Sequence, residues 1–239
     1  MDARGSTPYF GAAPDGSKLF VKALGEDERS ADVLFRLYRR VIPRDFGDEK
    51  PFTTLRRTVE HEALVALAAR DLGVRTPRLR AVATAAPNGY VLAYDAIEGK
   101  SLDGVADDDI TEGVLAACWG LVGHLRQHRI AHRDLRLANI FLAAEGEVWL
   151  IDFGFSELAA SDLLLANDVA ELVASSSIPV GPERAVAHAA ASVDPATLGR
   201  ALDRLRPWAL SGATRSALKA RPGLLPDLRS RLSDAVLVR

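Results

Sequence analysis

The sequence predicts an α+β protein with two lobes, an antiparallel-sheet lobe over residues 1–97 and a mainly helical lobe over residues 98–239. Two observations lead to this prediction. Hairpin patterns, in which two apolar runs flank turn-forming residues, dominate the part before Gly99. From residue 108 onward, apolar residues recur at helical spacing, with a single hairpin embedded among them. A chain of 239 residues is long enough for each lobe to bury a core of its own.

The first lobe begins with a predicted hairpin over residues 9–24, where two apolar runs flank the turn formers Pro14–Ser17. Residues 27–42 have helical spacing, and residues 43–52 read as a polar link. A stronger helix is predicted over residues 54–72.

That helix should end near Gly73, with Pro77 beyond it. Residues 79–97 predict a second hairpin around Pro87–Gly89, and Gly99 closes this part of the chain.

In the second lobe a long helix is predicted over residues 110–128, followed by a short hairpin centred on Glu145 and Gly146. Beyond residue 160 the pattern is helical. We expect this helical part to be interrupted at four prolines, Pro179, Pro195, Pro207 and Pro222.

The net charge of −2 gives no indication of a nucleic-acid partner. The charge is uneven, however, because residues 200–239 carry nine Lys/Arg against three Asp. This basic end could face a membrane or an acidic partner, or it could simply form solvated helix faces.

A single cysteine, Cys118, excludes a disulfide within the chain and favours a reducing compartment, so we expect a cytoplasmic location, possible also at the inner face of a membrane. No apolar run in the sequence reaches about 18 residues, so we expect no membrane span. We also expect no signal peptide.

Asn139 and Asp152 flank the predicted short hairpin. If the hairpin is centred on Glu145 and Gly146, positions whose numbers sum to 291 face each other, and Asn139 faces Asp152 at the open end. Carboxylate and amide oxygens are ligands for a hard cation such as Mg²⁺. Asp134, five residues before Asn139, should lie near the same end. The alternative is that these residues merely cap strand ends.

The strings His132-Arg133-Asp134 and Asp152-Phe153-Gly154 make this segment resemble the protein-kinase-like superfamily, as does the D-x-x-x-x-N spacing from Asp134 to Asn139. The resemblance implies that Asp134 orients or deprotonates an acceptor hydroxyl and that Asn139 and Asp152 bind Mg²⁺ on the phosphates of ATP. It also implies that Arg136 stabilises charge on the transferred phosphoryl group.

The same resemblance predicts a strand lysine and a helix glutamate upstream. Lys22 lies in the apolar run 19–24, where a lysine is costly unless it is paired, although a lysine on an edge strand could instead reach solvent. Glu62 shares one helical stripe with apolar residues, whereas Glu60 points away from it. We therefore expect Glu62 to be the partner of Lys22.

Residues 92–102 resemble the linker between kinase lobes, which implies that the backbone of Asp95 and Ile97 meets the adenine edge. The alternative is an ordinary strand end followed by a glycine turn.

The sequence departs from typical protein kinases in two places. No G-x-G-x-x-G loop precedes Lys22. Asp168, which resembles the aspartate that opens the helix after the activation segment, follows only 16 residues after Asp152, and no A-P-E string occurs. The short spacing resembles the RIO, lipopolysaccharide-kinase and aminoglycoside-phosphotransferase branches, and it leaves Arg133 without an evident phospho-residue to bind. More loosely, the chain is similar to kinase-like domains of large bacterial membrane proteins.

The main hypothesis from the sequence is an ATP- and Mg²⁺-dependent phosphotransferase acting on a hydroxyl of a small molecule, lipid, glycan or protein. A second hypothesis is a nucleotide-binding regulatory module with little turnover, which the missing glycine loop favours. A third is a structural domain that binds no nucleotide.

Overall fold

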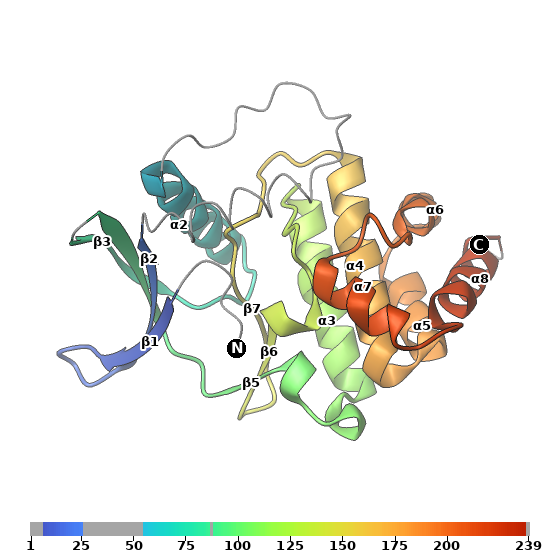
Figure 1. Ribbon diagram of the computed structural model, residues 1–239, viewed down its shortest axis with the longest axis horizontal. Helices are drawn as coiled ribbons and strands as arrows, with labels where there is room; N and C mark the ends of the chain where they lie inside the picture. The colour runs from blue at the N-terminus through green and yellow to red at the C-terminus, as the bar shows by residue number, and fades with distance from the viewer. Residues whose placement is uncertain (1–6, 26–54, 87, 238–239) are drawn as a thin grey trace. The chain divides into compact units, whose positions relative to one another are not determined.

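A computed structural model describes residues 7–25, 55–86 and 88–237 of the chain (Figure 1). The chain divides into two compact units. Unit 1 comprises the residues up to Asp71 together with Thr76–Ile97 and Asp152–Phe155, and unit 2 comprises Leu72–Arg75, Glu98–Ile151 and Ser156 onward. The chain passes from unit 1 to unit 2 mainly between residues 97 and 98, which is the lobe boundary expected from the sequence. Two short segments are exceptions, because Leu72–Arg75 belongs to unit 2 and Asp152–Phe155 belongs to unit 1. The helix predicted over residues 27–42 and the link over 43–52 lie outside the described residues.

Unit 1 contains a four-stranded antiparallel sheet in the order β1-β2-β4-β3. The strands are β1 (Thr7–Ala12), β2 (Lys18–Gly25), β3 (Leu79–Ala85) and β4 (Gly89–Asp95). Both predicted hairpins, β1–β2 and β3–β4, are confirmed. In the β1–β2 turn, the Asp15 carboxylate accepts a hydrogen bond from the backbone N–H of Ser17 (2.9 Å), as turn-forming aspartates commonly do.

Helix α2 (Leu55–Asp71) packs on this sheet, and its apolar stripe is the predicted one (Figure 1). Val59 and Ala63 of the helix form a core with Leu24 of β2 and Leu92 of β4. Paired residues of neighbouring strands face the same side, so the pairing of Lys22 with Leu92 turns Lys22 toward the helix. The fold of unit 1 thereby places a charged side chain in an apolar layer.

Unit 2 contains a three-stranded sheet of β5 (Gly99–Ser101), β6 (Ile140–Ala143) and β7 (Val148–Leu150). The β6–β7 hairpin is confirmed, but its predicted register is wrong by one residue. The paired positions, such as Ile140 with Leu150, sum to 290, because the loop spans residues 144–146, with Gly146 at φ 86°. Asn139 therefore faces Ile151, whose N–H donates to the Asn139 carbonyl (3.0 Å), and Asp152 follows one residue beyond.

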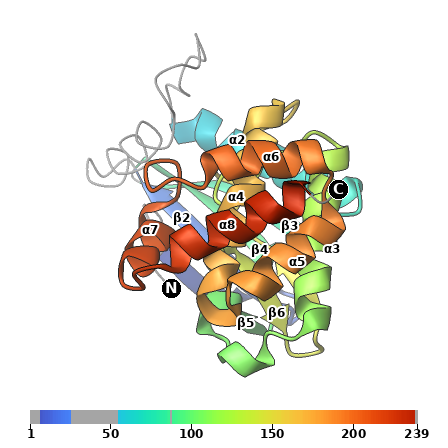
Figure 2. The same ribbon diagram turned by 90° about the vertical axis from the view of Figure 1, so that its right-hand side faces the viewer.

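The rest of unit 2 is helical, as expected. Figure 2 shows α8 lying across α5 and α6, and α4 contacts all four of the helices that follow it. Short 3₁₀ turns cover Leu102–Gly104, Asp107–Asp109 and Leu137–Asn139. The α-helices are α3 (Glu112–Gln127), α4 (Asp162–Val180), α5 (Pro182–Ser192), α6 (Pro195–Arg204), α7 (Gly212–Lys219) and α8 (Leu224–Leu237).

Three of the four predicted proline interruptions are confirmed. Pro195 begins α6, and Pro207 and Pro222 lie between helices. The interruption predicted at Pro179 occurs two residues later, at Gly181, because α4 includes Pro179 and ends at Val180. A proline this close to a helix C-terminus removes only one hydrogen bond, so the helix need not end before it.

Helices α3 and α4 supply much of the core of unit 2. Trp119 and Cys118 of α3 are each 1% exposed. Among the described residues, α4 is the single helix long and apolar enough to cross a membrane by length and composition, and 72% of its apolar window is buried inside the structure. Its buried face also carries Asp168 and Glu171. We therefore describe α4 as a core helix of unit 2.

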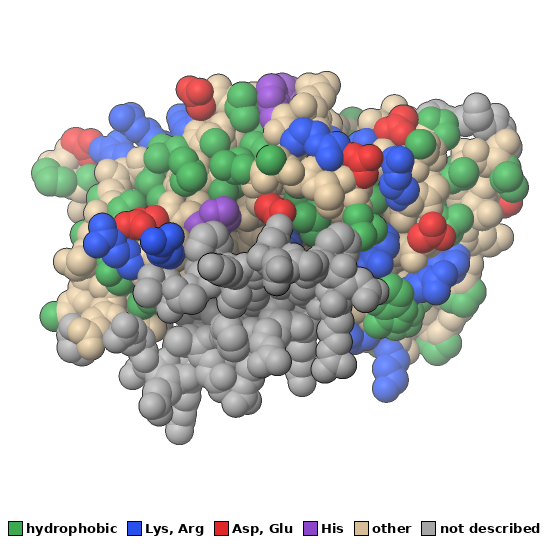
Figure 3. All heavy atoms as spheres, turned by 90° about the horizontal axis from the view of Figure 1, so that it is seen from above, with side chains coloured by type: hydrophobic (Ala, Val, Ile, Leu, Met, Phe, Trp, Pro, Cys, Tyr) green, Lys and Arg blue, Asp and Glu red, His purple; other side chains and the backbone are tan. Residues whose placement is uncertain are grey.

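Several arginines of the basic C-terminal part bind carbonyl groups at helix ends. Arg229 donates to the carbonyls of Leu202 (2.9 Å) and Leu205 (2.8 Å), and Arg221 donates to that of Ile178. Such bonds satisfy carbonyls that a helix end leaves without a partner. On the face drawn in Figure 3, basic and acidic side chains are interspersed over the half that carries the C-terminal helices.

Candidate functional site

Lys22 binds two carboxylates within unit 1. Its Nζ donates to both carboxylate oxygens of Glu62 (2.9 Å each) and to Oδ1 of Asp152 (2.9 Å). The Lys22 side chain is 14% exposed and that of Glu62 is 2% exposed. The structure therefore brings together three of the residues predicted from the sequence, and it identifies Glu62, not Glu60, as the partner of Lys22. Glu60 instead pairs with Arg56 at the surface (2.6 Å).

The surroundings of Lys22 keep it charged. Burial lowers the pKa of Lys22, but the negative charges of Asp152 and Glu62 outweigh burial and raise the pKa above its ordinary value. The phenol of Tyr94 donates to Glu62 Oε1 (3.4 Å), and burial, reinforced by the two carboxylates, raises the pKa of Tyr94. A protonated ammonium group is thus fixed in an apolar layer, where it can bind anionic oxygens.

The backbone around Asp152 is unusual for a non-glycine residue. Asp152 has φ 64°, in the left-handed region, so the chain turns sharply after β7. Next to it, a Cβ on Gly154 would lie 3.1 Å from Glu62 Oε2 and 3.3 Å from Asp152 Oδ1. The glycine of the D-F-G string therefore leaves the space in which the two carboxylates converge on Lys22.

Asp95 and Ile97, the predicted adenine contacts, lie at the end of β4 and just after it. The backbone N–H of Asp95 donates to the carbonyl of Arg78 (2.9 Å), and the N–H of Ala96 donates to that of Lys18 (3.0 Å). A backbone contact between Asp95 and adenine would therefore use the Asp95 carbonyl oxygen and not its N–H group. This role stays a prediction for both residues.

Asp134, Arg136 and Asn139 come together in unit 2. The Arg136 Nε donates to both carboxylate oxygens of Asp134 (3.0 and 3.2 Å). The Asn139 amide nitrogen donates to the Asp134 carbonyl (2.7 Å) and to its Oδ2 (2.8 Å). Since both bonds use the amide nitrogen, Oδ1 of Asn139 is fixed as an acceptor, which is the atom type that binds a hard cation.

The loop that carries Asp134 is anchored on α4. Asp168 accepts hydrogen bonds from the backbone N–H groups of His132 (2.6 Å) and Arg133 (2.7 Å). Burial raises the pKa of Asp168 to about 7, against the lowering effect of these two bonds. The expectation that Asp168 opens its helix is wrong, because α4 begins at Asp162, capped by Ser161. Because Asp168 lies inside the buried part of α4, the helix holds its carboxylate in a fixed position.

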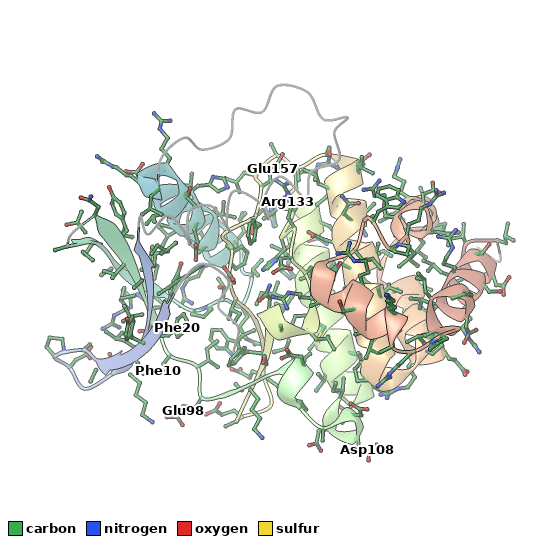
Figure 4. All side chains as sticks on the ribbon, viewed as in Figure 1. Phe10, Phe20, Glu98, Asp108, Arg133 and Glu157 are labelled. Atoms are coloured by element: carbon green, nitrogen blue, oxygen red, sulfur yellow. The ribbon has the colours of Figure 1, made fainter. Side chains whose placement is uncertain are left out.

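Arg133 has a partner that the sequence did not reveal. Its guanidinium donates to Glu157 (3.0 Å), and Figure 4 shows the two labelled side chains together in unit 2. Ala131 and Glu157 also exchange two backbone hydrogen bonds (3.0 and 2.8 Å). Arg133 has φ 64°, so this loop is held in a conformation that the surrounding contacts must stabilise.

A second carboxylate of α4 connects the loop after α6 to this region. Glu171 is buried and accepts hydrogen bonds from the N–H of Ser211 (2.8 Å) and the hydroxyl of Thr214. Burial raises the pKa of Glu171, against the lowering effect of the hydrogen bonds from Thr214 and Ser211. Helix α4 thus supports both the Asp134 loop and the segment that leads into α7.

Sequence reasoning missed Tyr94, Glu157 and Glu171. Tyr94 follows Leu92 by two residues on β4, so strand alternation could have placed it on the Lys22 side. Glu157 and Glu171 carry no local signal, because their partners are distant in the sequence and are met only in the folded chain.

The donor set suits Mg²⁺ better than zinc. Carboxylate and amide oxygens, as in Asp152 and Asn139, are hard ligands, and Mg²⁺ typically takes one or two of them together with phosphate oxygens and water. No group of three or more His, Cys, Asp or Glu side chains arranged to hold a metal occurs in the described part of the chain. Asp152 in unit 1 and Asn139 in unit 2 each offer an oxygen atom of the type that binds Mg²⁺.

The architecture is that of a kinase-like fold: an antiparallel N-terminal sheet with its helix, then a helical part containing the H-R-D loop and the D-F-G hairpin. No model of a protein family matches the chain. The structure of the Cydia pomonella granulovirus kinase PK-1 aligns with 63% of this chain and 48% of that chain, at 13% identity and a TM-score of 0.40.

Several of the curated proteins that are similar to this chain over short stretches are serine/threonine-protein kinases. Serine/threonine-protein kinase 36 of Pongo abelii is 31% identical over 84 residues, which are 33% of this chain and 6% of that protein. Serine/threonine-protein kinase SMU1 of Mycosarcoma maydis is 42% identical over 64 residues (25% and 9%). Serine/threonine-protein kinase Nek3 of Mus musculus is 37% identical over 60 residues (25% and 12%). The chain thus matches a small part of the length of these relatives.

Proposed function

We propose that the protein is an ATP- and Mg²⁺-dependent phosphotransferase that transfers the γ-phosphoryl group of ATP to a hydroxyl acceptor. The observation that carries the proposal is the binding of Lys22, whose side chain is 14% exposed, by Glu62 and Asp152. Burying an ammonium group between two carboxylates is costly for a purely structural purpose, and apolar residues would fill the same space at lower cost. A nucleotide phosphate and its cation would give both the lysine and Asp152 a further role.

The proposed roles divide the site by unit. In unit 1, Lys22 binds phosphate oxygens and Glu62 holds the lysine in place, while the backbone of Asp95 and Ile97 binds the adenine edge. Asp152, which also belongs to unit 1, is the proposed Mg²⁺ ligand of this unit. When bound, Mg²⁺ neutralises phosphate charge.

In unit 2, the amide oxygen of Asn139 is the proposed metal-binding atom. Asp134 orients the acceptor hydroxyl or accepts its proton, and Arg136 moves its guanidinium from Asp134 toward the developing charge of the phosphoryl group.

The short connection after the D-F-G string supports an atypical small-kinase branch, of the kind formed by RIO, lipopolysaccharide and aminoglycoside kinases. Only residues 156–161 separate unit 1 from the start of α4. Such a segment leaves little chain for docking an extended peptide. We therefore propose a small molecule, a lipid, a glycan or a compactly presented protein hydroxyl as the acceptor, on the cytoplasmic side, where the thiol of Cys118 remains reduced.

The test is ATP consumption with and without Mg²⁺ by the wild type and by Asp134→Ala. We expect Mg²⁺-dependent turnover in the wild type, even if only onto water, and a loss of at least roughly 100-fold in the variant, a typical contribution of a positioned acid–base group. ATP binding, measured by calorimetry, should be retained in the variant. Equal rates in both proteins with binding intact would contradict the enzymatic proposal.

A second candidate function is a nucleotide-binding regulatory module with little turnover. One observation favours it: Arg136 engages both carboxylate oxygens of Asp134, the group that an acceptor hydroxyl would need. The variant Arg136→Lys separates the two functions, because a lysine ammonium cannot reproduce the contact that the planar guanidinium makes through Nε with both oxygens. A regulatory module should bind ATP equally well in wild type and variant, with no turnover in either.

A further inference from the structure

Residues 204–226 form an acid-free stretch near the C-terminus. They contain five cationic residues and neither Asp nor Glu, a formal charge of +5 in a chain whose net charge is −2. The stretch runs from the end of α6 through α7 to the start of α8. The five cationic residues are Arg204, Arg206, Arg215, Lys219 and Arg221.

An exposed tryptophan lies inside this stretch. Trp208 is 58% exposed, whereas Trp119 in the core is 1% exposed. The guanidinium carbon of Arg204 lies 4.8 Å from the centroid of the Trp208 ring, and the Nε of Arg204 donates to Asn167 of α4 (2.6 Å). The ring is thus held in a defined position while much of its apolar surface faces water, an arrangement that costs hydrophobic free energy without a partner.

The cations around Trp208 differ from those elsewhere in the C-terminal part. Arg229 donates hydrogen bonds to carbonyl groups at the end of α6, and Arg231 forms an ion pair with Asp227 (2.8 Å). By contrast, Arg206 and Lys219 are exposed and have no ion pair within the described ranges. Arg215, also exposed, donates to the carbonyl of Pro207 beside Trp208 (3.4 Å). This bond leaves the positive charge of Arg215 without a carboxylate partner in the described ranges.

We propose that the segment from Arg204 to Lys219, the basic-aromatic segment, docks on an anionic lipid bilayer surface. Trp208 would insert at the level of the headgroups, and the surrounding cations would face anionic headgroups. Tryptophan is enriched at this level of membranes because its ring is apolar and its N–H is polar, and each Lys or Arg near an anionic surface adds to binding. The proposal does not depend on phosphotransferase activity.

A bilayer suits this segment better than an acidic protein does. A stable protein interface buries roughly 800 Å² on each partner around an apolar centre. Among residues 204–226, all of which the structure describes, Trp208 is the one exposed large apolar side chain, since Leu210 and Leu218 are buried. One aromatic anchor with several cations is enough for reversible attachment to a charged membrane. In Figure 3, hydrophobic and basic side chains border one another at the lower right, in the half that carries the C-terminal helices.

The test uses the full chain and vesicles of phosphatidylcholine with and without 30% phosphatidylglycerol. We expect co-sedimentation with the anionic vesicles at 50 mM salt, loss of binding at 500 mM salt, and a blue shift of tryptophan emission that Trp208→Phe abolishes. Arg206→Glu should weaken binding on the order of 25-fold, because each of the two charge units changed is worth roughly fivefold.

The matched control is Lys100→Glu, which makes the same change in net charge at an exposed position of β5. Lys100→Glu should weaken binding far less than Arg206→Glu. Equal weakening by the two variants, or no binding to anionic vesicles at 50 mM salt, would overturn the proposal. Binding to soluble polyglutamate as tight as to vesicles, without a shift in emission, would also overturn it, in favour of an acidic protein partner.

Discussion

The carboxylate of Glu157 lies 3.0 Å from the guanidinium nitrogen of Arg133. Arg133 directly precedes Asp134, the proposed catalytic residue, in the chain. The two side chains are 22% and 10% exposed, and the backbone of Glu157 is bonded in both directions to Ala131. The sequence left Arg133 without an evident anionic partner. The structure supplies a carboxylate of the same chain as that partner.

We predict that Glu157→Gln lowers turnover by roughly 10-fold, because removing one partner of a largely buried pair costs about 1–2 kcal/mol after allowance for its partial exposure. The effect should fall on the maximal rate and leave nucleotide affinity unchanged, since Glu157 lies in unit 2 and the lysine site in unit 1. Steady-state kinetics measure both quantities. Glu157→Asp should recover part of the rate, and a variant that changes only the affinity for ATP would contradict this role.

The pairing of Lys22 with Glu62 predicts a large difference between two neighbouring glutamates. Glu62→Gln removes the carboxylate that is 2% exposed and leaves the ammonium of Lys22 short of a partner, which should destabilise the fold by about 2–3 kcal/mol and weaken ATP binding. Urea unfolding and calorimetry measure the two effects. The control is Glu60→Gln, whose pair with Arg56 is exposed to solvent and should contribute far less to stability. Comparable losses in both variants would refute the importance of the buried pair.

Gly154 predicts a steric effect at the same site. In Gly154→Ala the new methyl group would lie 3.1 Å from Glu62 Oε2 and 3.3 Å from Asp152 Oδ1, so a carboxylate must move. We expect Mg²⁺-dependent nucleotide binding to weaken by about 10-fold, with a smaller change in stability. Gly120→Ala is the control, because a Cβ at that position of α3 meets nothing within 4 Å. That substitution should leave binding intact and stabilise the helix by about 0.5–1 kcal/mol. Unchanged binding in Gly154→Ala would count against the site.

The buried Asp168 predicts that stability falls as the pH rises. Burial raises the pKa of Asp168 from 3.8 to about 7, so between these values the folded state binds the proton and the unfolded state does not. The contribution of Asp168 is therefore greatest below pH 4 and is lost by pH 7, with a slope of up to about 1.4 kcal/mol per pH unit.

Urea unfolding between pH 5 and pH 8 measures this slope in wild type and in Asp168→Asn, in which it should be shallower. Glu171, whose pKa burial also raises, contributes with the same sign, so the double variant Asp168→Asn/Glu171→Gln should be shallower still. A slope that is identical in all three proteins would exclude Asp168 as its source.

The sequence predicted both hairpins of unit 1, helix α2 and the choice of Glu62, because alternation and helical period are local signals that packing then respects. It missed the register of the β6–β7 hairpin by one residue. Glycine at φ 86° in a three-residue loop shifts every pair relative to a two-residue turn, and sequence spacing alone does not distinguish the two.

The contacts around the Asp134 loop could be predicted only in part. The motif identified Asp134 and Asn139, since their spacing is fixed within one loop. The carboxylates that hold this loop, Asp168 and Glu157, depend on where α4 begins and on a backbone pairing with Ala131. Such long-range contacts are determined by tertiary packing, and they produce no periodic pattern in the sequence from which they could be predicted.

The burial of Cys118 has a practical consequence. Its side chain is 1% exposed inside α3, and burial raises the pKa of the thiol to about 12, so a thiol-labelling reagent cannot react with it while unit 2 is closed. As the single cysteine of the chain, it reports on one region without further engineering. The labelling rate of Cys118 therefore measures how often the core of unit 2 opens, and the change in that rate on adding ATP gives the free energy with which the nucleotide stabilises this unit.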